Sequence, residues 1–307
     1  MSTAFITHRD CLLHDMGAHH PECPARLSAI VDQLLASGLV NHLQQMEAPK
    51  ATREQLERVH APGYLDAIEE ALPSHGLVHL DPDTAMNPHT WEAALHAAGA
   101  ALLATDLVLT GQADNAFCSV RPPGHHATRN RAMGFCLFNN VAIAARHALE
   151  QYGLERVAIV DFDVHHGNGT EDIFRDDARV LMVSTFQHPF YPYSGTEEPA
   201  PNMINVPLPA GAGSRPFREA VTGQWLPALE ALRPQMVFFS AGFDAHVEDD
   251  MAMLRLVEAD YAWVTRKIKA VADKYAEGRM VSVLEGGYNL SALARSVVAH
   301  IKVLGGL

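Results

Sequence analysis

One stretch of the sequence places carboxylates and histidines close enough together to bind a metal ion. In Asp161-Phe-Asp163-Val-His165-His166, Asp163 and His165 are two residues apart. Side chains with this spacing project to the same side of an extended chain, so they can share one ion or form a simple buried ion pair. Asp244, in Ala-Gly-Phe-Asp, could complete the set. Because a catalytic zinc typically has three nitrogen or oxygen ligands and keeps a position for water, these three residues are predicted to hold zinc.

A second histidine pair, His125 and His126, could supply what amide hydrolysis at such a metal needs. Zinc lowers the pKa of its water and polarises a carbonyl, but the water still needs a base and the leaving amine a proton. Imidazole titrates near neutral pH and can make both transfers. Such histidines are usually oriented by a second group, and Asp161 and Asn168 are the candidates. Tyr288, which follows two glycines, could donate its hydroxyl to the oxyanion.

These residues follow short apolar runs that alternate with helical segments. Buried strands are predicted at Ala116–Val120, Val157–Phe162, Val180–Ser184, Val237–Ser240 and Val281–Leu284. Helices are predicted at Arg26–Ser37, Asn87–Gly111, Leu137–Tyr152, Arg215–Leu232, Val257–Tyr275 and Leu290–Leu304. This alternation is typical of an α/β protein with a mostly parallel sheet and helices on both faces, whose ligands bind outside the carboxyl ends of the strands. The proline-rich stretch Gln187–Pro209 is predicted to be a long functional loop.

Composition describes a globular chain. Of 307 residues, 48% are hydrophobic and no repeat or linker divides them, so residues 1–307 are predicted to form one domain. The net charge of −13 argues against direct binding to nucleic acid and leaves cationic partners open. The apolar stretch 93–110 is interrupted by His96 and Asp106, and the N-terminus has no apolar signal segment. We therefore expect no membrane span, a cytoplasmic location and free thiols for the four cysteines.

Six motifs resemble, in order, those of the histone deacetylase family. They are HPECPAR (20–26), RPPGHH (121–126), GFCLFNN (134–140), DFDVHHGNGT (161–170), SAGFDAH (240–246) and EGGYNL (285–290). That grouping also includes bacterial acetylpolyamine amidohydrolases and acetoin-utilisation proteins. The resemblance spans nearly the whole chain, and it implies the arginase–deacetylase fold, a single mostly parallel sheet flanked by helices.

The resemblance also implies a role for individual positions. One zinc ion per chain would be bound by Asp163, His165 and Asp244. The residues implied in catalysis are His125, His126, Tyr288, Asp161 and Asn168. Those implied to line a tunnel for the acylated side chain are Gly134, Phe135, Phe190 or Tyr191, Met251 and Gly286. Those implied to bind K⁺ or Na⁺ beside the zinc are Asp161, Asp163, His165 and Ser184, together with Phe174, Asp177 and Val180. Arg26 resembles an arginine that meets the released carboxylate below the zinc.

Two positions refine the expected chemistry and substrate. Asn168 stands where one branch of the family has aspartate, and the motif that contains it resembles that of the class II branch. A neutral amide stabilises imidazolium less than a carboxylate does, so His126 is expected to be less basic. Met251 stands where polyamine-selective animal relatives carry glutamate, which favours an acyl-lysine-type substrate. The acidic residues 248–250 and the negative net charge favour a polycation, so an acetylpolyamine is the alternative.

Two other functions compete with a deacetylase. A dinuclear manganese amidinohydrolase shares the fold but needs further bridging carboxylates, typically Asp-x-His-x-Asp, and Gly167 stands at the last of these positions. A non-catalytic acyl-amine binding module would be expected to lack a metal ligand or Tyr288, and neither is missing. The expected partner is an acylated amine, either an acetyl-lysine protein or peptide or an acetylpolyamine. The sequence leaves the oligomeric state open.

Overall fold

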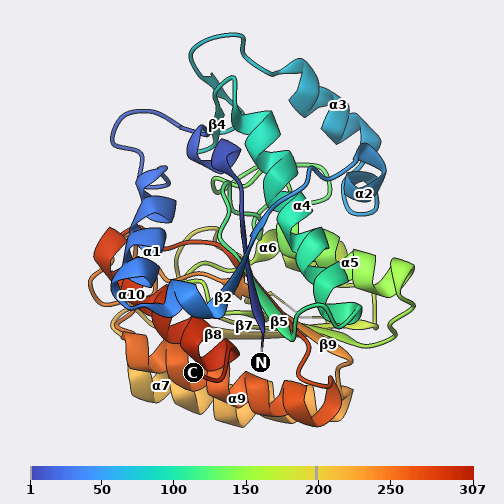
Figure 1. Ribbon diagram of the computed structural model, residues 1–307, viewed down its shortest axis with the longest axis vertical. Coiled ribbons are helices and arrows are strands. Elements are labelled where there is room, and N and C mark those ends of the chain that lie inside the picture. Colours follow the sequence, from blue (N-terminus) through green and yellow to red (C-terminus); the bar gives the residue numbers. More distant parts are fainter. Residues whose placement is uncertain (1, 198–199) are drawn as a thin grey trace.

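An eight-stranded sheet forms the centre of the molecule in the computed structural model, which describes residues 2–197 and 200–307. The strand order is β2-β1-β5-β10-β9-β6-β7-β8, and each pairing is parallel. The strands are β1 (Thr3–Thr7), β2 (Leu43–Glu47), β5 (Asn115–Cys118), β6 (Val157–Asp161), β7 (Val180–Gln187), β8 (Met203–Leu208), β9 (Met236–Ala241) and β10 (Met280–Leu284). In Figure 1, β1 rises from the N-terminus at the bottom, so the carboxyl edge of the sheet faces the upper half of the molecule.

The five strands predicted from apolar runs are all present, with ends shifted by a few residues. Three further strands, β1, β2 and β8, were not predicted. The segment Gln187–Pro209 is therefore not a loop throughout, because β8 lies within it and pairs with β7 from Met182–Met203 to Gln187–Leu208. Residues 198–199 of that segment lie outside the described part of the chain.

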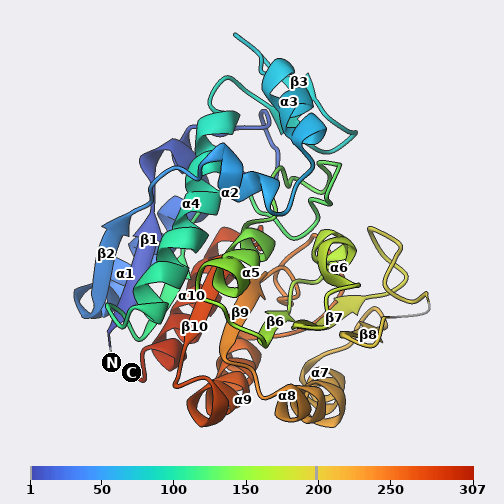
Figure 2. The same cartoon turned by 90° about the vertical axis from the view of Figure 1, so that its right-hand side faces the viewer.

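Helices cover the two faces of the sheet (Figure 2). On one face α1 (Ala25–Ala36) packs on α10 (Leu290–Leu304), which packs on α9 (Glu258–Tyr275), and α9 contacts α7 (Ser214–Ala220) and α8 (Leu226–Leu232). On the other face α4 (Thr90–Leu109) packs on α5 (Asn140–Gln151), which contacts α6 (Asn168–Phe174). Between these layers lies the apolar core, in which the strands β5, β6, β9 and β10 are completely buried.

Two predicted helices differ from the structure. α4 begins at Thr90 and not at Asn87, because the Oδ1 atom of Asn87 accepts the backbone N–H of His89 at 3.0 Å in a turn before the helix. The helix predicted over Arg215–Leu232 is interrupted by a π-helical turn, η3 (Val221–Trp225). Pro227 follows this turn and lacks the N–H that a continuous α-helix would use there, which accounts for the changed register.

The apolar helix α4 is long enough to cross a membrane by length and composition alone. In the fold, 72% of its most apolar window is buried, and the helix packs against α5 and the strands β5 and β1. This packing accounts for its apolar character as that of a core helix.

Shorter elements stand above the carboxyl edge of the sheet. They are η1 (Arg9–Leu12), α2 (Arg53–Glu57), α3 (Pro62–Glu70) and the two-stranded hairpin β3 (Val78–His79) with β4 (Ala85–Met86), while η2 (Leu39–His42) leads into β2. Figure 1 shows α2, α3 and β4 in the upper part of the molecule. Of these, the β3–β4 hairpin contacts the segment that follows β5, through hydrogen bonds from Gly134 and Phe135.

Candidate active site

Asp163, His165 and Asp244 meet at the carboxyl edge of the sheet. Asp163 and His165 follow β6, and Asp244 follows the neighbouring β9. The Nδ1 atom of His165 lies 3.0 Å from Oδ1 of Asp163 and 3.2 Å from Oδ2 of Asp244. One ligand atom from each residue lies within 4.8 Å of the others, and all three side chains are buried. The spacing read from the sequence therefore corresponds to a cluster of two carboxylates and one imidazole.

The surroundings of this cluster fit a bound cation. The Oδ2 atom of Asp244 is buried and has no hydrogen-bond partner among the described residues. The other oxygens are held by the backbone, since Val164 N–H donates to Oδ1 of Asp244 at 2.9 Å and Gly286 N–H donates to Oδ2 of Asp163 at 2.9 Å. A Cβ atom on Gly286 would collide with both carboxylates, so only glycine fits there. Carboxylate and imidazole donors in this number suit zinc.

Charge at the cluster is out of balance. Burial and the adjacent Asp163 raise the pKa of Asp244 to about 7. Burial opposes the charge on His165, but its hydrogen bond to Asp163 and the nearby carboxylate of Asp244 raise its pKa to about 9. Against the effect of burial, His125 and His165 lower the pKa of Asp163, so Asp244 is the carboxylate that lacks a full counter-charge, and a divalent cation would supply one.

The histidine pair lies directly beside the cluster. The rings of His125 and His126 are 4.1 Å apart, and the ring of His126 is 5.7 Å from that of His165. The Nδ1 atom of His125 lies 2.9 Å from Oδ2 of Asp161, and the Nδ1 atom of His126 lies 2.7 Å from Oδ1 of Asn168. The structure thus pairs Asp161 with His125 and Asn168 with His126, the histidine for which the sequence analysis expected the neutral partner.

The two histidines differ in their electrostatics. Burial disfavours charge on both, but the carboxylates of Asp163 and Asp161 hold the pKa of His125 well above its usual value. For His126, burial together with the positive charges of His125 and His165 holds the pKa well below its usual value. The pair therefore combines a protonated imidazole with a neutral one, which suits general acid–base chemistry.

Glu285, the residue that follows β10, anchors the loop that carries the histidine pair. Its Oε2 atom accepts the backbone N–H of Gly124 at 2.7 Å and that of His125 at 3.1 Å. It is fully buried, and burial raises its pKa to about 7. The sequence placed a carboxylate here at a strand end but did not assign this role, because the partners are backbone groups about 160 residues away.

A narrow cavity of about 210 Å³ opens above the cluster. It is lined by Asp83, His126, Gly134, Phe135, His165, Phe190, Tyr191, Met251 and Tyr288. The Phe190 ring stacks on His165 at 5.5 Å, and the Phe135 ring meets Tyr288 edge-on at 5.9 Å. Both Phe190 and Tyr191 contribute to the wall, where the sequence allowed either. Gly286 is not among the lining residues and lies against the carboxylates of Asp163 and Asp244.

Asp83 is a cavity residue that sequence reasoning missed. It lies in the turn of the β3–β4 hairpin, and its Oδ1 atom accepts the N–H of Gly134 at 3.2 Å. Next to it, Thr84 Oγ1 accepts the N–H of Phe135 at 3.0 Å. The hairpin thus holds the Gly134–Phe135 turn, in which both residues have positive φ. Strands of two residues leave no periodic pattern from which to predict this contact.

Tyr288 closes the side of the cavity opposite the histidine pair. Burial and the nearby Asp244 carboxylate hold the pKa of its hydroxyl well above the usual value, so it stays protonated. The Arg26 guanidinium lies 5.0 Å from its ring centre and donates to the carbonyls of Gly287 at 2.6 Å and Glu285 at 2.5 Å. Arg26 is fully buried and also pairs with Glu22, so a buried ion pair holds the Glu285–Tyr288 segment in place.

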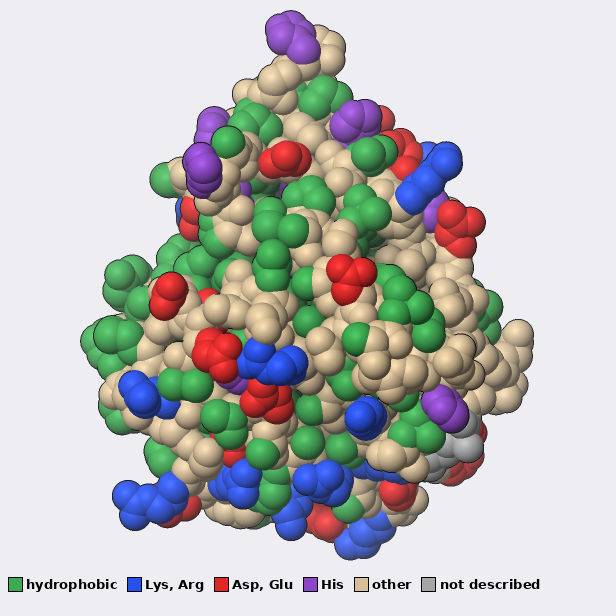
Figure 3. All heavy atoms as spheres, turned by 60° about the vertical axis from the view of Figure 1, so that its left-hand side comes forward, with side chains coloured by type: hydrophobic (Ala, Val, Ile, Leu, Met, Phe, Trp, Pro, Cys, Tyr) green, Lys and Arg blue, Asp and Glu red, His purple; other side chains and the backbone are tan. Residues whose placement is uncertain are grey.

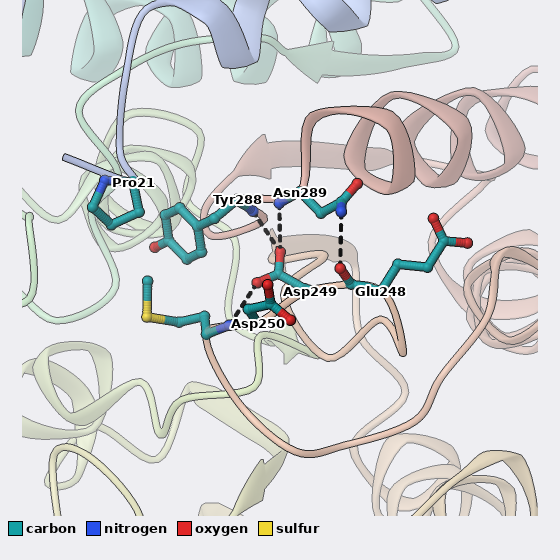
Figure 4. A pocket seen from close by; sticks show the side chains of 7 residues that line it. Pro21, Glu248, Asp249, Asp250, Tyr288 and Asn289 are labelled. Atoms are coloured by element: carbon teal, nitrogen blue, oxygen red, sulfur yellow. Dashed lines mark hydrogen bonds between the residues drawn. The ribbon is translucent and has the colours of Figure 1, made fainter. Parts of the chain in front are cut away.

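A second cavity of about 370 Å³ adjoins the first and shares Met251 and Tyr288 with it. It is lined also by Pro21, Glu248, Asp249, Asp250 and Asn289. Asp249 is buried and accepts the backbone N–H groups of Tyr288 at 2.6 Å and Asn289 at 2.9 Å, which Figure 4 shows. The entrance on this side is therefore acidic.

Comparison with known proteins identifies the family. Residues 20–304 match the model of the histone deacetylase domain. The chain belongs to the histone deacetylase family.

Several known proteins match this chain over almost all of its residues. A histone deacetylase-like amidohydrolase of Pseudomonas aeruginosa is 38% identical, over 99% of this chain and 86% of that protein. Polyamine deacetylase HDAC10 of Mus musculus is 38% identical, over 99% of this chain and 48% of that protein. The crystal structure of the HDA15 HD domain superposes with a TM-score of 0.92 at 36% identity, covering 99% of this chain and 90% of that one. The predicted arginase–deacetylase fold is confirmed, and the family makes this chain a hydrolase.

The positions that resemble the family's monovalent-cation ligands fall into two groups. Asp161 pairs in register with Ser184, whose Oγ atom is buried and has no partner among the described residues. The carbonyls of Phe174, Asp177 and Val180 converge at a different place, where the Nδ2 atom of Asn202 donates to all three at 2.8, 3.1 and 2.9 Å. The second group therefore has an amide at its centre, which the sequence did not reveal.

Proposed function

We propose that this histone deacetylase family member is a zinc-dependent deacetylase that hydrolyses the acyl amide of a primary amine, most readily of the N-acetyl-lysine type. The observation that carries the proposal is the position of Asp163, His165 and Asp244 at the base of a narrow, aromatic-lined cavity. The same cavity exposes His126 on one side and Tyr288 on the other. Together these residues are suited to hydrolyse an amide whose acyl end reaches the floor of the cavity.

Asp163, His165 and Asp244 would hold the zinc ion. Bound zinc supplies Lewis acidity, which lowers the pKa of water and polarises a carbonyl. Phe135 and Phe190 would enclose the aliphatic stem of the substrate between them and exclude bulk water. A cavity of about 210 Å³ admits one extended side chain but no folded peptide.

His126 would act as the base. Oδ1 of Asn168 accepts the proton on Nδ1 of His126, while Nδ2 of Asn168 is directed to Sδ of Met133 at 3.4 Å. The Nε2 atom of His126 therefore carries the free lone pair, and the low pKa of this ring keeps it neutral. It can accept a proton from the attacking water and return it to the departing amine nitrogen. The protonated His125 beside it stabilises negative charge as the carbonyl is attacked.

Tyr288 would donate its hydroxyl to the oxygen of the attacked carbonyl. Its ring is held by Phe135 and Arg26, so little reorganisation is needed during the reaction. A preorganised donor of this kind contributes on the order of 3 kcal/mol to the stability of an oxyanion.

An acetylpolyamine is the second candidate substrate, and the cavity of Figure 4 favours it. The carboxylates of Asp249 and Asp250 lie near Tyr288, where a second ammonium of a substrate would emerge from the narrow cavity, whereas Glu248 points away and pairs with Arg295 at 2.7 Å. On the face drawn in Figure 3, most lysine and arginine side chains lie in the lower half, away from the carboxyl edge of the sheet. Met251, which lies between the two cavities, is apolar and presents no charge to that ammonium.

The test is a side-by-side assay of an acetyl-lysine peptide, acetylputrescine and acetylspermine with chelator-treated and zinc-reloaded protein. We expect hydrolysis that depends on zinc and a higher kcat/KM for the peptide. A preference for acetylspermine would favour the second candidate. Two metal ions at the catalytic cluster would support the manganese amidinohydrolase, and binding of all three compounds without hydrolysis would support a binding module.

A further inference from the structure

A second group of potential metal ligands lies away from the candidate active site. His8 follows β1, Asp10 lies in η1 and His96 lies in α4. One ligand atom from each lies within 4.8 Å of the others. The side chains of His8 and His96 are 12% and 7% exposed, and that of Asp10 is 20% exposed, so the cluster is enclosed but open on one side. Like the candidate active site, it stands at the carboxyl edge of the sheet, where ligands of parallel sheets bind.

Both imidazoles turn an unprotonated nitrogen toward Asp10. The Nδ1 atom of His96 lies 2.8 Å from the carbonyl oxygen of Ala48 and must donate its proton there, which leaves the lone pair on Nε2. That Nε2 atom lies 3.5 Å from Oδ2 of Asp10. In His8, the lone pair of Nδ1 accepts the backbone N–H of Asp10 at 3.2 Å, so this nitrogen can bind a metal only after the ring turns away from that N–H. A backbone carbonyl that fixes the tautomer in this manner is typical of histidines that ligate metals.

Nε2 of His96 and Oδ2 of Asp10 are therefore two electron-rich atoms that face each other with no proton between them. They are 3.5 Å apart, and Nδ1 of His8 lies 3.7 Å from the same oxygen. In a tetrahedral site with bonds of about 2.1 Å, neighbouring ligand atoms lie about 3.4 Å apart. The separation between His96 and Asp10 is close to this value. A cation at their centre would convert a repulsive arrangement into an attractive one.

Charge around the cluster is negative. Glu47 at the end of β2 brings its Oε1 atom within 3.6 Å of Nε2 of His8, and its side chain is 75% exposed and free to turn. Arg9 is 86% exposed and lies 3.8 Å from Asp10, and among the described residues it is the one basic side chain besides the histidines within 4 Å of that carboxylate. Asp10 and Glu47 thus exceed the local positive charge.

We propose that His8, Asp10 and His96 form a second metal site of this chain, for a first-row divalent ion such as Zn²⁺. Imidazole and carboxylate donors together suit zinc and its neighbours better than magnesium or calcium. The rings of His8 and His96 are stacked 3.4 Å apart, with 11° between their planes, so binding requires the more exposed His8 ring to turn out of the stack.

Occupation of this site ties together three segments of the N-terminal region. The ion joins the end of β1 and the η1 turn to α4. The carbonyl of Cys11 in that turn accepts an N–H of Arg121 at 2.8 Å, and Arg121 also pairs with the buried Glu22. A structural ion here therefore stabilises the position of Arg121 and Glu22, and Glu22 in turn holds Arg26 under the ring of Tyr288.

The experiment counts the ions in protein freed of metal with a chelator and then titrated with Zn²⁺, or with Co²⁺ as a visible probe. Wild-type protein should bind two ions per chain. Asp244→Ala, which removes a ligand of the catalytic cluster, should still bind one. Adding His8→Gln and Asp10→Asn to Asp244→Ala should abolish that remaining ion, whereas adding His89→Gln, a change at an exposed histidine just before α4, should leave it.

A second measurement separates this site from the catalytic one. His8→Gln with Asp10→Asn, in an otherwise wild-type chain, should retain deacetylation, bind one ion and lose the rise in Tm that the second ion produces. If Asp244→Ala binds no ion, or if its single ion survives the His8 and Asp10 changes in a chain whose circular dichroism is native, the second site does not exist. Neither result depends on whether the zinc-loaded catalytic cluster deacetylates any substrate.

Discussion

The Nδ1 atom of His126 lies 2.7 Å from the Oδ1 atom of Asn168, so the imidazole on the cavity wall is oriented by a neutral amide. A carboxylate at the same distance would stabilise the imidazolium form. Because burial and its cationic neighbours already hold the pKa of His126 well below the usual value, the amide leaves this ring neutral over the working pH range. The hydrogen bond to a neutral amide thus helps to set the lowest pH at which His126 can accept a proton.

Asn168→Asp should raise the pKa of His126 by about one to three units, the usual effect of a nearby opposite charge. Activity that needs neutral His126 is lost below its pKa, so the acidic limb of the kcat/KM profile should move to higher pH. Asn130→Asp adds the same charge on the exposed surface and should leave the profile unchanged. If Asn168→Asp leaves the acidic limb where it is, His126 is not the base.

Tyr288→Phe should lower kcat by about 10²- to 10³-fold with little change in KM, because the lost hydroxyl acts on the oxyanion more than on the bound substrate. Zinc content should stay the same, since Tyr288 is not among the cluster ligands. Tyr193→Phe, a change at a side chain that is 73% exposed, serves as the control. Equal kcat in wild type and Tyr288→Phe would exclude the hydroxyl from catalysis.

The central part of the sheet and the residues at its carboxyl edge were predictable from local sequence. Strands such as β6 and β9 are buried on both faces, so they appear as short apolar runs, and polar residues directly after them stand out. Asp163 and Asp244 could be grouped for this reason without knowledge of the register. The sequence did not predict that the two strands are neighbours, which the pairing of β6 with β9 shows.

The edges of the sheet were missed because edge strands do not carry that pattern. β2, at one edge, reads Leu-Gln-Gln-Met-Glu and exposes most of its side chains. β8, at the other edge, contains Pro207 and lies among further prolines, which are tolerated on an edge and suggest a loop. The contacts of Glu285 with Gly124 and of Asp83 with Gly134 join distant segments through the backbone, so no local pattern records them.

Met251→Glu should shift selectivity toward acetylpolyamines, because it adds a carboxylate where the two cavities meet. An exposed ion pair contributes up to ~1 kcal/mol, so kcat/KM for acetylspermine relative to the acetyl-lysine peptide should rise about fivefold. The gain should shrink at high ionic strength. Met253→Glu adds the same charge at a position that is 59% exposed and lies outside both cavities, and it should not change the ratio. An unchanged ratio in Met251→Glu would mean that the second ammonium does not pass this residue.

His300, a buried histidine of α10, makes the stability of the fold depend on pH. Its ring is fully buried, with Nδ1 2.7 Å from Oγ1 of Thr265 and Nε2 2.9 Å from Oγ of Ser282, and burial lowers its pKa to about 3. An unfolded histidine titrates near pH 6.5, so below that pH the unfolded chain gains a proton that the folded chain does not. Stability contributed by this residue is therefore present above about pH 6.5 and falls as the pH is lowered towards 3.

His300→Gln should remove this dependence while keeping a polar side chain in the site. The variant should be less stable than wild type at pH 7.5, but the difference should narrow by about 2 kcal/mol at pH 5. Urea unfolding at the two pH values measures this difference in the free energy of unfolding. His75→Gln, a change at an exposed histidine, is the control. A difference between variant and wild type that is the same at both pH values would show that His300 is not the group whose protonation drives acid unfolding in this range.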